Sequence, residues 1–343
     1  MKTYKLNCEI LSPIHIGSGN EIDPLNYLIA GGRLHRISFE DFVAGLNDEQ
    51  RAKFENLIDK GTLIDLRKFV EEKIDKDRDT VYSIEVSPKV DGLYKAKIND
   101  IQNQLLISPF IRSEGEATPL IPGSSVKGAI RTAVVSELAV KSDLPKPKEP
   151  RDEYTFESRV LGYKDAKDDP FRGIKIRDKF LQKDNTIVRD VRNMSKKRGG
   201  SLMKNDIQII CEVSHSSLTD KTVDFISEIS FDDKLFNTKF LSRTITMEQI
   251  IKSCRDFYSD KMNQEHKKFY AGSEIEKIST QLLNTPLNDD SFLLRIGRFS
   301  GVESVTLDKY RNPKPPGNKA VWGTSRNLAE GLYPMGWVKV TVS

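Results

Sequence analysis

The chain has 343 residues, of which 37% are hydrophobic and 30% are charged, and its net charge is +4. No apolar run approaches the roughly 20 residues of a membrane span, and the N-terminus has no signal-peptide core. The three scattered cysteines and four dispersed histidines lack metal-ligand spacing, so we expect no disulfide, metal or other cofactor. The composition indicates a soluble cytoplasmic protein, long enough for two domains.

The positive charge is concentrated in two zones of the sequence. Residues 141–200 contain 17 Lys/Arg and 11 Asp/Glu, and residues 291–340 contain 8 and 3. The remainder of the chain is therefore acidic. Basic zones on a nearly neutral body favour a local contact with a polyanion such as nucleic acid. Solvated charged loops are the alternative interpretation of the same pattern.

Strands and helices are both predicted, in alternation along the chain. Period-two alternation and β-branched runs predict strands at 4–10, 26–37 (a hairpin around Gly31-Gly32), 81–111 (several, with turns at Ser87-Pro88 and Asp91-Gly92), 171–180, 202–213, 292–296 and 337–342. Helical spacing predicts helices after Ser38, over 48–74 with a break near Gly61, after Gly123, and over 247–283. Two loops are predicted, a proline-rich one at 144–150 and a mobile basic one at 189–200. This mixture indicates an α+β fold.

The most informative segment is Ile121–Arg131, with the sequence IPGSSVKGAIR. Its Pro-Gly pair predicts a turn, and Ser124 or Ser125 is predicted to cap the helix that follows. Val126 and Ile130 begin an apolar stripe that continues at four-residue spacing and marks the buried face of this helix. The polar residues of the segment therefore lie at the start of a helix.

Two cations and a glycine occupy the exposed side of that helix start. Lys127 and Arg131 are one turn apart, where the free amides and dipole of a helix attract anions. Gly128 has no side chain and lets another backbone approach closely. The segment thus predicts a site for a phosphate or a sugar-phosphate chain. A capped surface helix with two solvated cations is the alternative.

An ordered set of motifs resembles the RAMP proteins, which are RRM-like subunits of CRISPR effector complexes. Residues 122–131 are similar to their Pro-Gly-Ser-Ser-x-Lys-Gly-x-x-Arg signature, and residues 10–19 to their opening strand and glycine-rich turn. Residues 169–178 resemble their Asp-Pro-Phe-Arg segment, and residues 294–301 their C-terminal glycine-rich loop. Length and motif order are most similar to the fifth subunit of type III-A (Csm) complexes.

The resemblance implies two ferredoxin-like (RRM-like) units with helical and loop insertions. We place the first unit at residues 1–200, including the basic loop, and the second at 201–343. The resemblance also implies a non-catalytic RNA-binding subunit that grips the guide RNA (crRNA) backbone near its 3′ end. Such a subunit caps the filament of backbone subunits and supports guide RNA maturation in antiviral defence. The implied partners are guide RNA, target RNA as a further candidate, the neighbouring backbone RAMP subunit, the small helical subunit and a host nuclease that trims the 3′ end.

The residues expected to contact RNA are glycines, serines and cations of these motifs and of the basic loop. They are Gly123, Ser124, Ser125, Lys127, Gly128, Arg131, Arg172, Arg192, Lys196, Lys197, Arg198, Arg295 and Arg298. Contacts to phosphate and 2′-hydroxyl groups carry no sequence code, which suits a subunit that must accept any guide sequence. For Arg295 and Arg298, surface arginines beside a turn are the alternative.

His15 is the one catalytic candidate. In RAMP relatives that process guide RNA, a histidine near the glycine-rich turn is catalytic. As a general base it would take a proton from a ribose 2′-hydroxyl, with Lys127 or Arg131 stabilising the phosphorane. We favour a packed histidine, because no second His or Tyr lies at a recognisable spacing. A metal-independent guide-processing endoribonuclease therefore stays an alternative, as do the sister subunit that holds the guide 5′ tag and a protein scaffold without RNA affinity.

Overall fold

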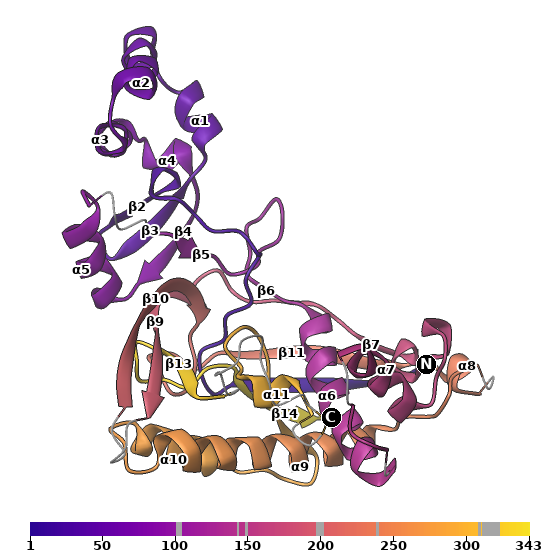
Figure 1. Ribbon diagram of the computed structural model, residues 1–343. Helices are drawn as coiled ribbons and strands as arrows, with labels where there is room; N and C mark the ends of the chain where they lie inside the picture. Colours follow the sequence, from indigo (N-terminus) through magenta and orange to yellow (C-terminus); the bar gives the residue numbers. More distant parts are fainter. Residues whose placement is uncertain are drawn as a thin grey trace.

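A computed structural model describes the chain except residues 101–104, 143, 148–149, 197–201, 238–239, 308–309 and 311–322. The chain forms a body and a smaller lobe that projects from it (Figure 1). The lobe comprises residues 24–98, and the body comprises both ends of the chain. Within the described residues, no helix combines the length and apolar character needed to cross a membrane.

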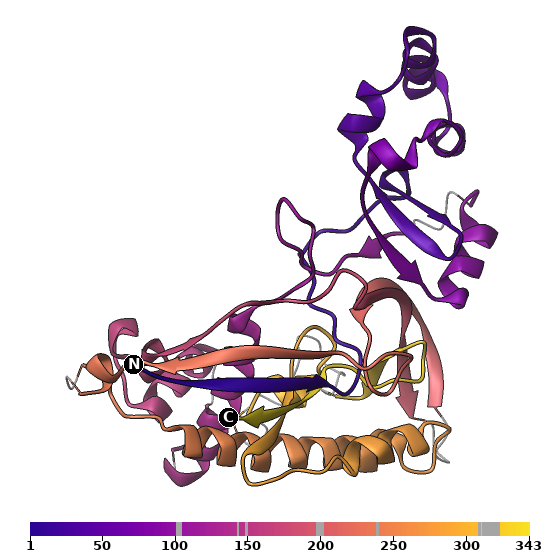
Figure 2. The same ribbon diagram turned by 180° about the vertical axis from the view of Figure 1, so that it is seen from behind.

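A five-stranded sheet forms the centre of the body, in the order β12-β14-β1-β11-β7. Its strands are β1 (Lys2–Ile10), β7 (Ile174–Ile176), β11 (Asp224–Phe231), β12 (Ser291–Arg295) and β14 (Trp337–Val342). The first strand is therefore the middle one, with Leu6 opposite Ser227 on one side and Val342 on the other. Seen from behind, β1 and β11 lie in front of α6 (Gly123–Ser142) (Figure 2).

The main hydrophobic core lies between this sheet and two long helices, α6 and α9 (Met247–Glu265). The stripe predicted for α6 is buried against it, with Ile130 and Val134 fully inaccessible. Trp337 on β14 is also buried, and its ring packs edge-on against Tyr258 of α9. Burial of these large apolar side chains holds both helices to one face of the sheet.

A second, seven-stranded sheet joins the lobe to the body. Its order is β2-β3-β4-β9-β10-β5, with β13 on the other edge of β9. The strands are β2 (Tyr27–Ala30), β3 (Arg33–Ile37), β4 (Thr80–Val86), β5 (Ile107–Ser108), β9 (Thr186–Lys196), β10 (Leu202–Ser214) and β13 (Ser325–Ala329). β4 of the lobe runs parallel to β9 of the body, and this pairing connects the two parts within one sheet.

The remaining elements are short or lie at the periphery. In the lobe they are α1 (Phe39–Ala44), α2 (Asp48–Lys60), α3 (Leu63–Lys73), α4 (Lys76–Asp79), α5 (Pro88–Lys97) and the 3-10 turn Pro24–Asn26. In the body they are β6 (Leu120–Ile121), β8 (Lys179–Phe180), α7 (Pro150–Leu161), α8 (Asp233–Asn237), α10 (Glu276–Leu283), α11 (Val302–Val305), the 3-10 turns Ala166–Asp168 and Pro170–Gly173, and the π-helical turn His266–Tyr270.

The α+β fold class is confirmed, and the two curled sheets are compatible with two RRM-like units. The hairpin at Gly31-Gly32 forms with both glycines at positive φ, and Ser38 caps α1 as predicted. The division at residue 200 falls inside the β9–β10 hairpin, and both sheets take strands from both sides of it. The sheets therefore do not follow the predicted boundary.

Three predicted segments are wrong. Residues 88–97 form helix α5 rather than turns between strands, because Ser87 caps its third amide and Pro88 suits the first helical turn. The supposed mobile loop 189–200 is strand β9 up to Lys196, paired on both sides by β10 and β13. Residues 171–180 contain a 3-10 turn and two short strands instead of one strand.

Candidate nucleic-acid interface

Helix α6 begins at Gly123, whereas a cap at Ser124 or Ser125 would start it two or three residues later. The Gly123 amide donates to Oδ1 of Asp178 at 2.7 Å, so the cap comes from a distant loop and not from Ser124 or Ser125. A β-carbon on Gly123 would lie 2.1 Å from the carbonyl oxygen of Ile176. The predicted cap is thus wrong, and Gly123 serves the packing of α6 against β7. Ser124 is exposed, and because Asp178 already caps the helix, the Ser124 hydroxyl is not needed for that role.

Three of the predicted motifs meet at one cleft, called here the motif cleft, of about 460 Å³. It lies between the glycine turn after β1, the start of α6 and the loop after β12. Its wall residues from these segments are Ile16, Gly17, Ser124, Ser125, Gly128, Ala129, Arg295, Ile296, Gly297, Arg298 and Ser300. A β-carbon on Gly128 would meet nothing within 4 Å. The exposed side of α6 therefore gives the cleft an open backbone surface.

The loop after β12 is fixed to the glycine turn by the main chain. The Arg298 amide donates to the His15 carbonyl at 2.7 Å. Gly297 has φ +84°, and a β-carbon there would lie 2.5 Å from the same carbonyl oxygen, so glycine is required. The Arg298 side chain is exposed, with its guanidinium 4.9 Å from the Phe299 ring centre. These contacts place one cation at the edge of the cleft.

Lys127 and Arg131 differ in how their charges are used. Nζ of Lys127 donates to the Ile174 carbonyl at 2.7 Å, and partial burial lowers the pKa of this amine. Arg131 forms ion pairs with Glu157 and with Asp169, the latter at 2.8 Å. Arg131 thus holds α6 to its neighbours, and its charge is balanced locally.

Arg295 lines the inner wall of the cleft, although only 2% of it is exposed. Its guanidinium pairs with Glu265, which also accepts from Nε of Arg326 at 2.9 Å. Arg326 in turn pairs with Glu303 at 2.9 Å. Although burial would raise the pKa of Glu265, the two guanidiniums hold it below its usual value. The charge of Arg295 is thus balanced in a buried network that supports the loop, and its contact with RNA stays a prediction.

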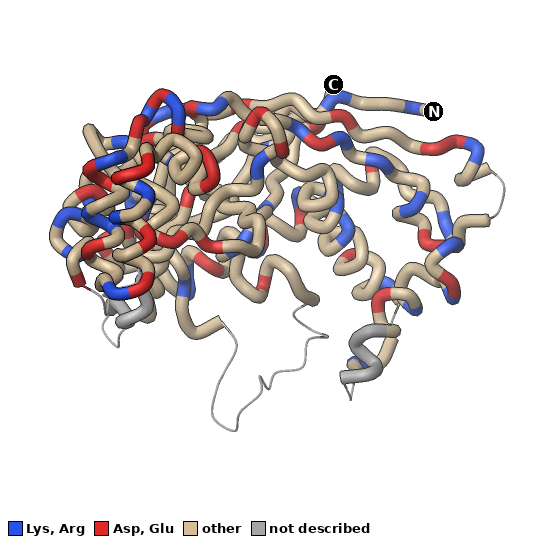
Figure 3. Tube along the Cα trace, turned by 90° about the horizontal axis from the view of Figure 1, so that it is seen from above, with Lys and Arg blue, Asp and Glu red and all other residues tan. Residues whose placement is uncertain are grey.

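Arg172, Arg192 and Lys196 do not line the motif cleft. Arg192 and Lys196 are on β9, where Arg192 pairs with Asp190 and Lys196 donates to the Ala271 carbonyl at 2.8 Å. Arg172 is exposed and donates to the Lys167 carbonyl at 3.0 Å. Lys197 and Arg198 are outside the described residues. Basic and acidic residues are interspersed along the trace (Figure 3), so the cleft is distinguished by its geometry more than by net charge.

His15 is fully buried. Its Nδ1 lies 2.6 Å from the Glu212 carbonyl and must donate to it, which leaves Nε2 as an acceptor without a partner in the described structure. The ring stacks on Phe299 and meets Phe110 edge-on. A β-carbon on Gly17 would lie 2.9 Å from Nε2, so the glycine turn covers this atom. The geometry agrees with a packed histidine.

Acid should destabilise the fold through the buried histidines. Burial lowers the pKa values of His15 and His215 below 6.5, so the unfolded chain binds protons more strongly. This contribution to stability is complete above about pH 6.5 and is lost as the pH falls towards the folded-state pKa values. We expect the free energy of unfolding to fall between about pH 7 and 5, and to fall less in His15→Asn. Urea titrations at several pH values would test this, and equal pH slopes for the two proteins would contradict it.

The chain belongs to the RAMP superfamily, whose family model matches residues 7–301. This result confirms the family resemblance drawn from the sequence motifs. Three of those motifs, separated by more than 100 residues along the chain, line the same cleft. The fourth, at residues 169–178, supplies Asp178 to the start of α6 and Asp169 to Arg131.

Similar proteins come from CRISPR systems. The chain is 30% identical over 145 residues to a Methanocaldococcus jannaschii protein named "CRISPR system Cms protein Csm5"; the match covers 39% of this chain and 30% of that protein. The fold matches a chain of a Csm–crRNA–target RNA ternary complex from a type III-A system, with TM-score 0.71, 21% identity, and 99% and 100% of the two chains covered. It also matches the crystal structure of T. onnurineus Csm5, with TM-score 0.64, 20% identity, and 97% and 99% of the two chains covered.

Proposed function

We propose that this chain is a crRNA-binding subunit of a type III-A CRISPR ribonucleoprotein and grips the guide backbone in the motif cleft. The observation that carries the proposal is the convergence of three RAMP motifs on one open cleft. The partial similarity to a Csm5 protein supports the type of complex. The matching fold of a chain from a Csm–crRNA–target RNA complex agrees with this assignment.

The cleft offers groups that bind a sugar-phosphate chain. The Ser124 hydroxyl is exposed, Gly128 permits close approach of a backbone, and Arg298 supplies a cation. Groups of this kind pair with phosphate oxygens and ribose hydroxyls without reading base edges. A guide RNA of any sequence would therefore be held equally well.

The finer assignment concerns position and role. We propose that the subunit sits near the guide 3′ end, closes the filament of backbone subunits and does not cleave RNA. It would contact the neighbouring backbone RAMP subunit and the small helical subunit, act in the cytoplasm, and help a host nuclease to trim the guide. The buried His15 supports the non-catalytic role, because its Nε2 lies under Gly17.

Removing Arg298 at the edge of the motif cleft, together with Lys127 of the neighbouring α6 motif, should weaken RNA binding and its dependence on salt. We expect Lys127→Ala/Arg298→Ala to bind single-stranded RNA more weakly than the wild type, with a log–log salt slope smaller by roughly one per lost phosphate contact. The matched control is Arg51→Ala/Lys60→Ala on α2, which removes the same two residue types from an exposed face of the lobe. Fluorescence anisotropy across a salt series would measure both, with the isolated chain and with the assembled complex.

Three results would each contradict a part of the proposal. Equal affinities for the cleft variant and the lobe control would show that RNA does not use the cleft. Cleavage to 2′,3′-cyclic phosphate ends that disappears in His15→Ala would establish the endoribonuclease instead. A footprint on the guide 5′ tag would assign the sister-subunit role and overturn the 3′ position.

A further inference from the structure

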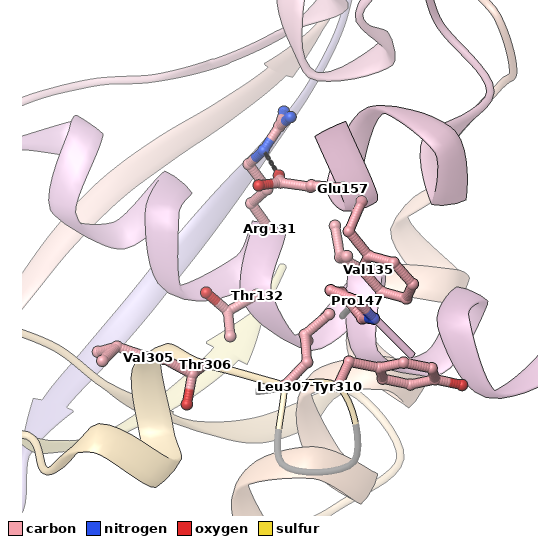
Figure 4. Close-up of a pocket in the computed structure, with 10 residues that line it drawn as sticks. Arg131, Thr132, Val135, Pro147, Glu157, Val305, Thr306, Leu307 and Tyr310 are labelled. Carbon is pink, nitrogen blue, oxygen red and sulfur yellow. Dashed lines mark hydrogen bonds and ion pairs between the residues drawn. The ribbon is translucent and has the colours of Figure 1, made fainter. Parts of the chain in front are cut away.

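A second cavity of about 240 Å³ lies further along α6 (Figure 4), and it shares wall residues with the motif cleft. We call it the side pocket. It is formed by α6, α7 and the segment after α11. Its apolar and aromatic wall consists of Val135, Pro147, Phe156, Val305, Leu307 and Tyr310. A cavity below the roughly 300–1,000 Å³ of sites for drug-sized ligands suits a single small flat group.

The aromatic part of the wall is held in place by other contacts. The Phe156 and Tyr310 rings have centres 4.6 Å apart and planes inclined by 31°. The Tyr310 hydroxyl donates to the Ala139 carbonyl at 2.9 Å. Phe156 is 3% exposed. The rings are thus positioned before any ligand binds, which lowers the entropic cost of binding.

The charges at the rim are already balanced. Arg131 and Glu157 line the pocket and form an ion pair with each other, and Asp169 takes a second side of the guanidinium. A phosphate at this point would have to compete with two carboxylates. The side pocket therefore favours a neutral, flat, apolar-faced group over an anion.

The side pocket and the motif cleft share two wall residues, Thr132 and Val305. Thr132 lies four residues, about 6 Å along the helix axis, beyond Gly128 on α6. A nucleotide whose phosphate rests at Gly128 would therefore have the mouth of the side pocket within reach of its base. The motif cleft would thus hold the sugar-phosphate part of a nucleotide, and the side pocket would hold its base.

We propose that the side pocket binds one unstacked nucleobase of the RNA strand whose backbone lies in the motif cleft. The inference rests on the proposed function, since that strand must occupy the cleft. Stacking on aromatic and aliphatic walls is tolerant of base identity, because every base has a π-face. The pocket would fix the register of the strand on the subunit without selecting its sequence.

The test uses single-stranded RNAs that carry one abasic nucleotide, moved stepwise along the oligomer. With the wild type, one position should bind at least roughly fivefold more weakly than the intact RNA, since a stacked base contributes about 1–3 kcal/mol. With Tyr310→Ala the intact RNA should weaken by a similar factor, and the abasic change at that position should have little further effect. This cycle isolates the base–pocket interaction.

A bulky substitution provides a second, independent variant. Val305 is 57% exposed at the shared wall, so Val305→Trp should fold and should obstruct the pocket. Val140→Trp is the matched control, because Val140 is 58% exposed on α6, which forms part of the pocket, but does not itself line the side pocket. We expect the abasic effect to disappear in Val305→Trp and to persist in Val140→Trp.

The outcomes separate this inference from the proposed function. Salt-dependent RNA binding with the same affinity for every abasic RNA would overturn the nucleobase pocket and leave the guide-binding proposal intact. Loss of the abasic effect in both tryptophan variants would also overturn it, since general crowding along α6 would then be the cause. Absence of any RNA binding, by the isolated chain and by the assembled complex, would contradict the proposed function itself.

Discussion

Glu265→Ala should lower the free energy of unfolding by about 3–5 kcal/mol, the cost expected when one partner of a buried ion pair is removed. Glu265 is 4% exposed and accepts from the guanidiniums of Arg295 and Arg326. Without the Glu265 carboxylate, Arg295 and Arg326 would remain buried but would lose the acceptor that they share. The network joins α9 to β12 and β13, so its loss should loosen the support of the glycine-rich loop.

Urea denaturation followed by circular dichroism measures this effect. The control is Glu228→Ala, which breaks the exposed pair with Arg177 and should change stability by at most about 1 kcal/mol. The loss of stability in Glu265→Gln should lie between those of Glu265→Ala and Glu228→Ala, because an amide accepts hydrogen bonds without carrying the charge. If Glu265→Ala were no more destabilising than the control, the network would not support the fold.

Alanine at Gly123 and alanine at Gly128 should have opposite effects on stability, although both glycines belong to the same motif. At Gly123 the new β-carbon would collide with the Ile176 backbone, and moving α6 away from β7 should cost about 1–3 kcal/mol. At Gly128 the space is open, so Gly128→Ala should stabilise α6 by about 0.5–1 kcal/mol. The same methyl group should nevertheless weaken RNA binding, because it projects into the motif cleft.

Gly92→Ala is the control for the second effect. Gly92 lies inside α5 of the lobe, and a β-carbon there also meets nothing within 4 Å. It should gain similar stability and bind RNA like the wild type. Thermal denaturation and RNA titration of the three variants measure both properties. Unchanged RNA affinity in Gly128→Ala would mean that the strand does not cross this side of α6.

The sequence predicted those elements whose signals are local. The Gly31-Gly32 turn, the Ser38 cap and the helix break at Gly61 each depend on a few neighbouring residues. Strand β9 was mistaken for a loop because its partners come from elsewhere, including β13 more than 100 residues later. A charged segment can form a strand when backbone groups and carboxylates that are distant in the sequence pair with it. Its composition does not reveal these partners.

The candidate site shows the same limit. Sequence patterns singled out the segments that line the motif cleft, but only the family resemblance related them to one another. The predicted RNA contacts Arg131 and Arg295 have carboxylate partners that the sequence does not reveal: Glu157 is 26 residues from Arg131, and Glu265 is 30 from Arg295. Glu265 had no local signal at all. Asp178 stood inside a recognised motif, and its capping role needed the three-dimensional contact with Gly123.

The place of β1 in the middle of its sheet determines when the body can be completed during synthesis. Leu6 of β1 pairs with Val342 of β14, so during synthesis β1 lacks this partner until β14 has been made. Until then β1 has an unpaired edge and part of the core is open, a state that favours slow folding and aggregation. Chains that lack β14 should therefore not complete the fold of the body. The lobe can form earlier, because its strands β2–β4 pair with one another locally.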